Sequence, residues 1–294
     1  MKNDMAKVMR LYRFVSAIVL LLPFIAMGQS DTAVVETVRP VLSAYTLELG
    51  SAHIAQTYLS PLRHSGWTTA FSYERMQAMR FNPDRWVMRL AGRLDFSKTS
   101  NVPAHNSSMW NLGLSADWSM MYRWRMDAWQ FYGGGYTSAE VGALYLPRNS
   151  NNPVAARAAW NLGITVAVAY NGTFKGIPFC ARYLAQMPLT GVFFAPEYGE
   201  LYYEIYLGNH RNLVRGAWPG NYFRLNNLLT VDLRFGGTIV RLGYRCGITS
   251  VKASHNVGRH IDHTAVIGIA SEWISLSAKR RRPSRECRII SALY

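Results

Sequence analysis

Arginine and carboxylate side chains recur in this sequence at even spacings that would place them on one side of an extended segment. Arg89 and Arg93 are four residues apart, and Arg241 and Arg245 repeat that spacing. Successive side chains of a strand point to opposite faces, so each pair projects in one direction. Arginine keeps its charge and presents a planar fork of donors, so such a group needs carboxylates or bound anions. The candidate residues are Arg89, Arg93, Asp95, Asp117, Arg123, Arg182, Glu204, Asp232, Arg234, Arg241 and Arg245.

Three kinds of chemistry fit this charged set. Buried charges must pair, which favours a salt-bridge network that fills a narrow interior. An arginine-rich constriction would instead attract a small anionic solute. Catalysis by the carboxylates is the third alternative. If the network forms, Asp117 should pair with Arg89 or Arg93, and Asp232 should pair with Arg241 or Arg245.

Other motifs that could carry chemistry give weaker signals. His64 and Ser65 could form a lipid-hydrolysing pair with the histidine as base, but adjacent strand residues point apart, which favours ordinary loop residues. The glycine run 133–135 lacks the lysine of a phosphate loop, and the cysteines and histidines lack metal-binding spacing. The basic run 279–283 resembles a nucleic-acid patch, a role that export would make implausible. We therefore predict no catalytic residue, metal, cofactor or nucleic-acid partner.

The elements that must position these charges are strands. In residues 109–124, large apolar side chains alternate with small or polar ones, which indicates a strand with one apolar and one polar face. Its 16 residues would reach on the order of 50 Å at ~3.3 Å per residue. The apolar face carries Trp110, Leu112, Leu114, Ala116, Trp118, Met120, Tyr122 and Trp124. The same alternation marks 86–96, 158–170 and 238–250 and, more weakly, 45–53, 67–79, 129–145, 174–187, 200–208, 228–236 and 263–276.

The distribution of residue types between the two faces indicates the environment. Small and charged residues suit a lumen, whereas large apolar and aromatic residues suit lipid, as in outer-membrane barrels. A spanning strand needs only about 9–11 residues, so the longest strands would project beyond the bilayer. We predict that Trp110, Leu112, Leu114, Trp118, Leu162, Ile164, Val166 and Val168 face outward. The alternative is a secreted soluble β-sandwich with extended strands.

The connections suggest the topology. Short turns are predicted at 82–84, 125–128, 171–173 and 236–237, and long connections at 54–66, 97–108, 147–156, 209–227 and 251–262. Outer-membrane barrels place short turns in the periplasm and long loops outside. An additional membrane-spanning strand at 192–194 would keep short turns at one end and long loops at the other, and would give about 12 strands. The alternatives are that 188–199 folds into the lumen as a plug, or that the tail 288–294 forms the last strand.

Composition and the N-terminus indicate export. The 294 residues are 49% hydrophobic, 13% aromatic and 17% charged, with a net charge of +15. Four basic residues precede the apolar run 14–22, and Ala26 and Gly28 are small. This order is typical of a cleaved secretory signal. We predict a signal peptide over 1–28, a barrel over 29–278 and a basic tail over 279–294.

Several segments resemble an uncharacterised family of exported proteins of Bacteroides-type Gram-negative bacteria, known as a domain of unknown function. The similar segments are 58–62, 191–199, 202–205 and 272–275. The resemblance implies an outer-membrane setting and supplies no active site.

The sequence therefore predicts an all-β protein, a single antiparallel up-and-down transmembrane β-barrel. Its predicted function is that of a structural or transport-type outer-membrane protein, with a narrow arginine-rich channel as one form. Its expected partner is outer-membrane lipid, with a small anionic solute as a second candidate. An outer-membrane enzyme that modifies lipid or lipopolysaccharide is the main alternative.

Overall fold

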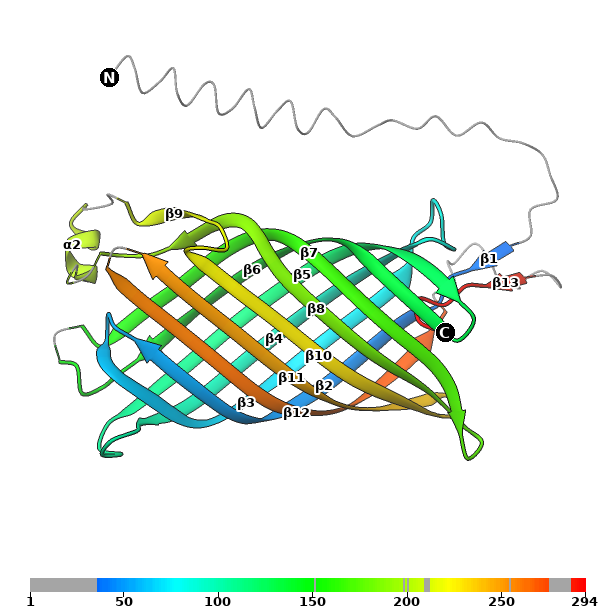
Figure 1. The fold of residues 1–294 in the computed structure, drawn as a ribbon, viewed down its shortest axis with the longest axis horizontal. Helices are drawn as coiled ribbons and strands as arrows, with labels where there is room; N and C mark the ends of the chain where they lie inside the picture. Colours follow the sequence, from blue (N-terminus) through cyan, green and yellow to red (C-terminus); the bar gives the residue numbers. More distant parts are fainter. Residues whose placement is uncertain are drawn as a thin grey trace, which may run out of the picture. The chain divides into compact units, whose positions relative to one another are not determined.

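Ten long strands form one closed antiparallel barrel (Figure 1). The structure is a computed structural model that describes residues 36–150, 152–197, 199, 201–208, 212–253, 255–274 and 287–294. The barrel strands are β2 (Val41–Gln56), β3 (Ser60–Ala78), β4 (Trp86–Asn101), β5 (Ser108–Met126), β6 (Trp129–Tyr145), β7 (Val154–Phe174), β8 (Ile177–Phe194), β10 (Tyr222–Phe235), β11 (Thr238–Ala253) and β12 (Asn256–Trp273).

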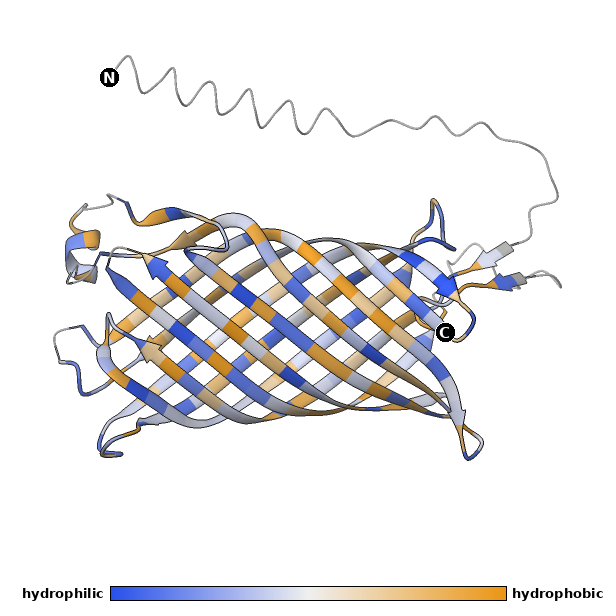
Figure 2. Ribbon diagram, viewed as in Figure 1, coloured by the Kyte–Doolittle hydropathy of each residue, from blue (hydrophilic) through white to orange (hydrophobic). Residues whose placement is uncertain are grey.

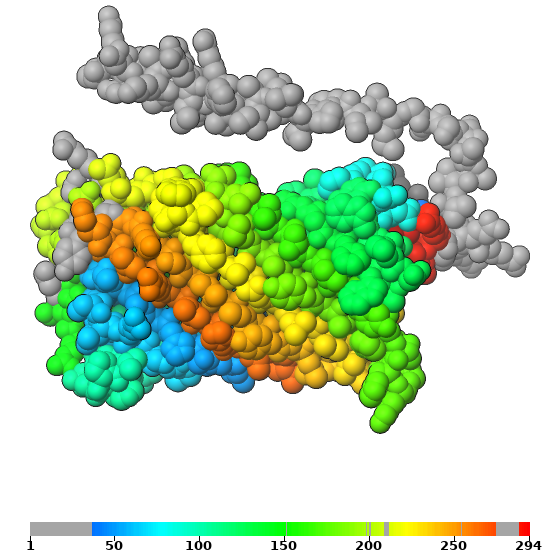
Figure 3. Space-filling model, viewed as in Figure 1, coloured from blue at the N-terminus to red at the C-terminus, as the bar shows by residue number. Residues whose placement is uncertain are grey.

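Closure comes from pairing between β8 and β10, which joins the two edges of the sheet. Elsewhere neighbours in the chain pair with each other, and β12 pairs with β2. In the space-filling view, the orange strand β12 lies beside the blue strands at the start of the barrel (Figure 3), where it pairs with β2, and β3 follows on the other side of β2. Because every barrel strand has a partner on both sides, the barrel has no open sheet edge, as lipid requires. The predicted all-β antiparallel barrel is confirmed.

The strand count differs from the prediction: the barrel has ten strands rather than about twelve. Residues 192–194 are the end of β8, not a separate crossing. Pro188 lies inside β8, where a bulge opposite Gly163 tolerates its missing N–H. Residues 200–208 do not cross either, because Tyr202–Tyr206 form the short helix α2. The Glu204 carboxylate accepts a hydrogen bond from the backbone N–H of Leu201, which caps this helix.

The outer wall is apolar along alternate residues of each strand (Figure 2). Leu112, Leu114 and Val166 are each about half exposed, while the residues between them are buried or partly buried. Trp110 and Val168 share this outward face but are partly covered by neighbours. The exterior placement predicted for these side chains is confirmed. It follows from the period of two, since alternation assigns every second residue to one face.

The two ends of the barrel differ in their connections. At one end, here called the terminal end, β5–β6, β7–β8 and β10–β11 are joined by two-residue turns. Asp127, Lys175, Gly176 and Gly236 adopt positive φ angles there, as tight hairpin turns require. The β7–β8 turn is at 175–176 rather than the expected 171–173, because Gly172 and Thr173 are paired within the hairpin.

The opposite end, here called the loop end, carries the connection from β8 to β10. This connection contains α2 and the short strand β9 (Val214–Ala217), which pairs with the end of β8. The loops expected at 54–66 and 251–262 are mostly strand, and the connections there are confined to 57–59 and 254–255. The ends of β2, β3, β11 and β12 are polar, so their composition resembles that of loops, and the sequence did not reveal that they are strand.

The segments outside the barrel are short. β1 (Glu36–Val38) pairs in parallel with β13 (Cys287–Ile289) at the terminal end. Residues 1–35 form a separate unit from 36–294. The predicted signal peptide lies within 1–35, outside the described residues, as do residues 275–286 of the expected basic tail. Among the described helices, none is long and apolar enough to cross a membrane.

Candidate functional site

Glu74 is the centre of a buried charge cluster in the lumen. Its carboxylate accepts from Arg89 Nε at 2.5 Å, from Arg182 Nη2 at 2.6 Å and from Arg241 Nη1 at 2.5 Å. The three guanidinium groups come from β4, β8 and β11, so the cluster spans the barrel. Each of these arginines is only 2% exposed. Buried charges of this kind are stable only when they are paired and hydrogen-bonded.

Carboxylates from neighbouring strands complete this first layer. Asp232 accepts two hydrogen bonds from Arg241, both at 2.7 Å, in a bidentate pair. Asp232 and Arg241 are direct partners in the β10–β11 register. Asp117 on β5 pairs with Arg89 on β4. Both cross-strand pairs expected from the sequence are confirmed.

A second layer surrounds Glu48, which lies four residues nearer the loop end than the level of Glu74. Glu48 accepts from Arg93 and Arg245, each at 3.0 Å, and from the Ser72 hydroxyl at 2.6 Å. Arg93 also contacts Asp95 at 3.1 Å and Asp262 at 3.4 Å. Glu48 is fully buried. This layer therefore fills the lumen with two arginines and three carboxylates.

Between the C-terminal tail and the loop end, the barrel strands place equal numbers of arginines and carboxylates in the lumen. The arginines are Arg89, Arg93, Arg157, Arg182, Arg224, Arg241 and Arg245, and the carboxylates are Glu48, Glu74, Asp95, Asp117, Glu140, Asp232 and Asp262. Every arginine of this set except Arg157 forms an ion pair with a described carboxylate. The cavity among these charges is about 90 Å³, room for only a few waters at roughly 30 Å³ each.

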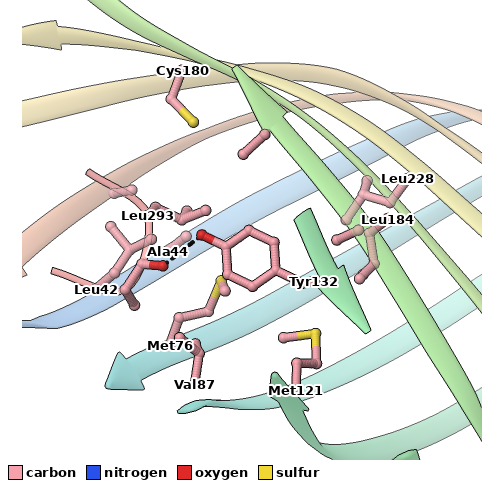
Figure 4. Packing of buried hydrophobic residues seen from close by; sticks show 14 of the residues in the cluster. Leu42, Ala44, Met76, Val87, Met121, Tyr132, Cys180, Leu184, Leu228 and Leu293 are labelled. Atoms are coloured by element: carbon pink, nitrogen blue, oxygen red, sulfur yellow. Dashed lines mark hydrogen bonds between the residues drawn. The ribbon is translucent and has the colours of Figure 1, made fainter. Parts of the chain in front are cut away.

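The C-terminal residues fill the terminal end of the lumen. Arg123 donates to the backbone oxygens of Ser291 at 2.6 Å and Ala292 at 3.2 Å. Tyr132 donates to the Ala292 oxygen at 2.8 Å, and Leu293 packs with Leu42 and Met76 in an apolar cluster (Figure 4). The tail 290–294 is thus an internal plug, not the last barrel strand that was one alternative.

The remaining predicted residues divide between this plug and the surface. Arg234 pairs with Glu272 at 2.9 Å and lies 4.1 Å from the Tyr294 ring centroid. It therefore belongs to the plugged end. Glu204 lies on α2, exposed and outside the barrel wall, so its assignment to the lumen is wrong. The error follows from reading the helix 202–206 as a strand.

His64 and Ser65 do not form a catalytic pair. Both lie on β3, where His64 points into the barrel and is 1% exposed, while Ser65 is on the opposite face. His64 Nδ1 contacts the Leu62 carbonyl oxygen at 3.2 Å. The arrangement gives no nucleophile–base contact.

Several lumen residues were missed by the sequence reasoning. Glu48 lies in a weakly patterned strand, but Tyr45, Leu47 and Leu49 face outward, so parity could have placed Glu48 inside. Asp262 was missed because its strand was predicted to begin at 263, whereas β12 begins at Asn256. Arg224 lies in a strand end that was assigned to the loop 209–227, and Arg157 lies between the predicted loop 147–156 and the predicted strand 158–170.

Removing Arg123 should free the plug. Arg123→Ala deletes donors to Ser291, Ala292, Pro83 and Asp84. We expect a loss of roughly 1.5–3 kcal/mol of unfolding free energy, the scale of hydrogen bonds from a charged donor. Carboxypeptidase should then trim the tail faster, as followed by mass spectrometry. Arg85→Ala, an exposed arginine at the same end, is the control. Equal trimming rates in the two variants would contradict the plug.

The sequence matches a known protein family over most of its length. A model described as protein of unknown function (DUF3316) matches residues 14–280. The chain belongs to this family. No curated protein matches the DUF3316 chain.

The DUF3316 chain resembles several solved barrels in outline. The translocator domain of the autotransporter NalP from Neisseria meningitidis is 8% identical, with a TM-score of 0.38, and the match covers 92% of this chain and 98% of that one. An outer-membrane channel from Pseudomonas putida F1 is 8% identical, with a TM-score of 0.36 and coverage of 84% and 100%. The outer-membrane protein OprG from Pseudomonas aeruginosa is 9% identical, with a TM-score of 0.32 and coverage of 83% and 100%.

Proposed function

We propose that this protein is an outer-membrane β-barrel of structural type whose lumen is occluded. The apolar exterior supports a lipid setting, because half-exposed Leu, Ile, Val and Trp side chains line the whole wall. The short turns of the terminal end would face the periplasm, and the loop end would face outside. A Gram-negative host of the Bacteroides type remains a prediction from the family resemblance.

The charge-matched lumen is the observation that supports occlusion. Arg89, Arg182 and Arg241 share Glu74, and Arg93 and Arg245 share Glu48, so these guanidinium groups are already neutralised. An anion entering there would have to displace carboxylates that are held by short, charge-assisted hydrogen bonds. This favours a closed network over an anion path. The plug 290–294 adds a second barrier at the terminal end.

The two alternatives receive less support. An enzyme that acts on lipid needs a nucleophile and a base that converge, and His64 and Ser65 lie on opposite faces. A soluble β-sandwich would hide its large apolar side chains between two sheets, whereas here they lie on the exterior of a closed barrel.

Planar-bilayer recording tests the proposed occlusion. We expect the inserted full chain to show no stable open state, because two charge layers and the plug close the lumen. Insertion is checked independently by flotation of the protein with vesicles and by its heat-modifiable migration. Steady, reproducible conductance steps from the inserted protein would contradict occlusion, and anion selectivity of those steps would favour the channel alternative.

A further inference from the structure

A second cavity, here called the vestibule, lies between the charged lumen and the loop end. Its volume is about 110 Å³. Apolar side chains form its walls, among them Ile54, Leu144, Phe193 and Val251. A cavity of this size with apolar walls holds a short hydrocarbon chain, and holds a single ring when its walls move outward slightly.

The floor of the vestibule carries a positive charge without a carboxylate partner. Arg157 on β7 forms no ion pair with any described carboxylate, unlike the other six arginines between the plug and the loop end. Its Nη2 donates to Asn111 Oδ1, and Asn111 Nδ2 in turn donates to Asp95 at 2.7 Å. Asp95 is already paired with Arg93. Arg157 therefore reaches a described carboxylate only through Asn111, and its guanidinium group borders the cavity.

Two polar donors on this floor lack a partner among the described residues. They are Arg157 Nε and His260 Nε2, both buried. Arg157 Nη1 lies 3.3 Å from His260 Nδ1. Because the guanidinium can only donate, His260 Nδ1 accepts, and a neutral ring then carries its proton on Nε2. Both unmatched atoms are thus N–H donors, and an unmatched buried donor is costly.

The other described polar groups of the vestibule do not accept a hydrogen bond from Arg157 Nε or His260 Nε2. Glu140 also lines it, but its carboxylate binds Arg224 and the Tyr222 hydroxyl. Tyr202 on α2 covers the cavity and accepts a hydrogen bond from the Ala156 N–H at 2.6 Å. Burial raises the pKa of Tyr202, so its hydroxyl stays neutral beside an anion.

We propose that the vestibule binds a small amphipathic monocarboxylate, with the carboxylate on Arg157 and His260 and the apolar part against Ile54, Leu144 and Phe193. A carboxylate supplies both missing acceptors in one group, and its hydrogen bonds to a guanidinium group are charge-assisted. The inference goes beyond occlusion and does not depend on it.

Benzoate is the probe, measured by titration calorimetry with the full chain in detergent. We expect saturable binding of benzoate and at least tenfold weaker binding of benzyl alcohol and of acetate, which lack the charge or the ring. Arg157→Gln should weaken benzoate binding roughly 10- to 100-fold, the scale of one charge-assisted hydrogen bond. Arg63→Gln, an exposed arginine on β3, is the matched control and should leave binding unchanged.

A second variant separates loss of binding from loss of folding. Ala155→Phe fills the vestibule from its wall and keeps Arg157, so it should abolish benzoate binding. Heat-modifiable migration reports whether each variant is folded. The proposal is overturned if the folded full chain shows no saturable benzoate binding, if benzyl alcohol binds equally well, or if either folded variant binds benzoate like the unmodified chain. These outcomes are independent of conductance, so they leave the occlusion proposal standing.

Discussion

Glu74→Gln is expected to destabilise the barrel by about 3–5 kcal/mol, the cost of removing one partner from a buried charge pair. Arg89, Arg182 and Arg241 all donate to this carboxylate. Arg182 has no other carboxylate partner among the described residues, so its charge would be left uncompensated in the lumen. Glutamine keeps nearly the same shape, so the effect isolates the charge.

Urea unfolding in lipid vesicles, followed by tryptophan fluorescence, measures this change. Glu204→Gln is the matched control, because it makes the same chemical change at an exposed position on α2. We expect that control to stay within about 0.5 kcal/mol of the unmodified chain, as surface substitutions usually do. A Glu74→Gln variant as stable as the control would show that the network does not hold the lumen together.

The second large effect is expected on the outer face. Ile164 lies at the middle of β7 and is 44% exposed on the exterior. Ile164→Arg should cost about 2–4 kcal/mol, since it places a charge near the bilayer midplane. Phe174→Arg is the depth control, because Phe174 lies at the terminal end of the same strand and faces outward.

The depth control should cost only about 0–1 kcal/mol, the value for a charge near the membrane interface. Unfolding in vesicles gives both numbers on the same scale. Equal costs at Ile164 and Phe174 would mean that depth does not matter, and the wall would then not lie in lipid.

The sequence predicted which side chains face outward and which arginines and carboxylates pair across neighbouring strands, because a strand allows only two side-chain directions. The outward position of Leu112, Leu114 and Val166 follows from parity within one strand. The Asp232–Arg241 pair follows from the short turn between β10 and β11, which fixes their register. Both inferences rest on local geometry, and both were confirmed.

The number of strands and the position of the plug depend on long-range contacts, which the alternation of residues within one strand does not show. Pairing of β8 with β10 skips the whole segment around α2, and no local pattern reveals that long-range closure. Residues 202–206 are three tyrosines, a glutamate and an isoleucine, a run too short to separate a helix from a strand. The plug is held by side-chain donors to the carbonyls of Ser291, Ala292 and Leu293, a type of contact available to almost any sequence.

Site-directed spin labelling along β5 tests the central claim most directly, namely that the barrel places its apolar face in lipid and its polar face in a closed lumen. Single cysteines would be introduced from 110 to 118 in a chain with Cys180, Cys246 and Cys287 replaced by serine. The predicted result is a period of two, in which a label at Leu114 meets lipid-dissolved oxygen while a label at Ser115 meets neither oxygen nor an aqueous nickel chelate. Access of the nickel chelate to the label at Leu114 would contradict the lipid setting, and its free access to the label at Ser115 would contradict the closed lumen.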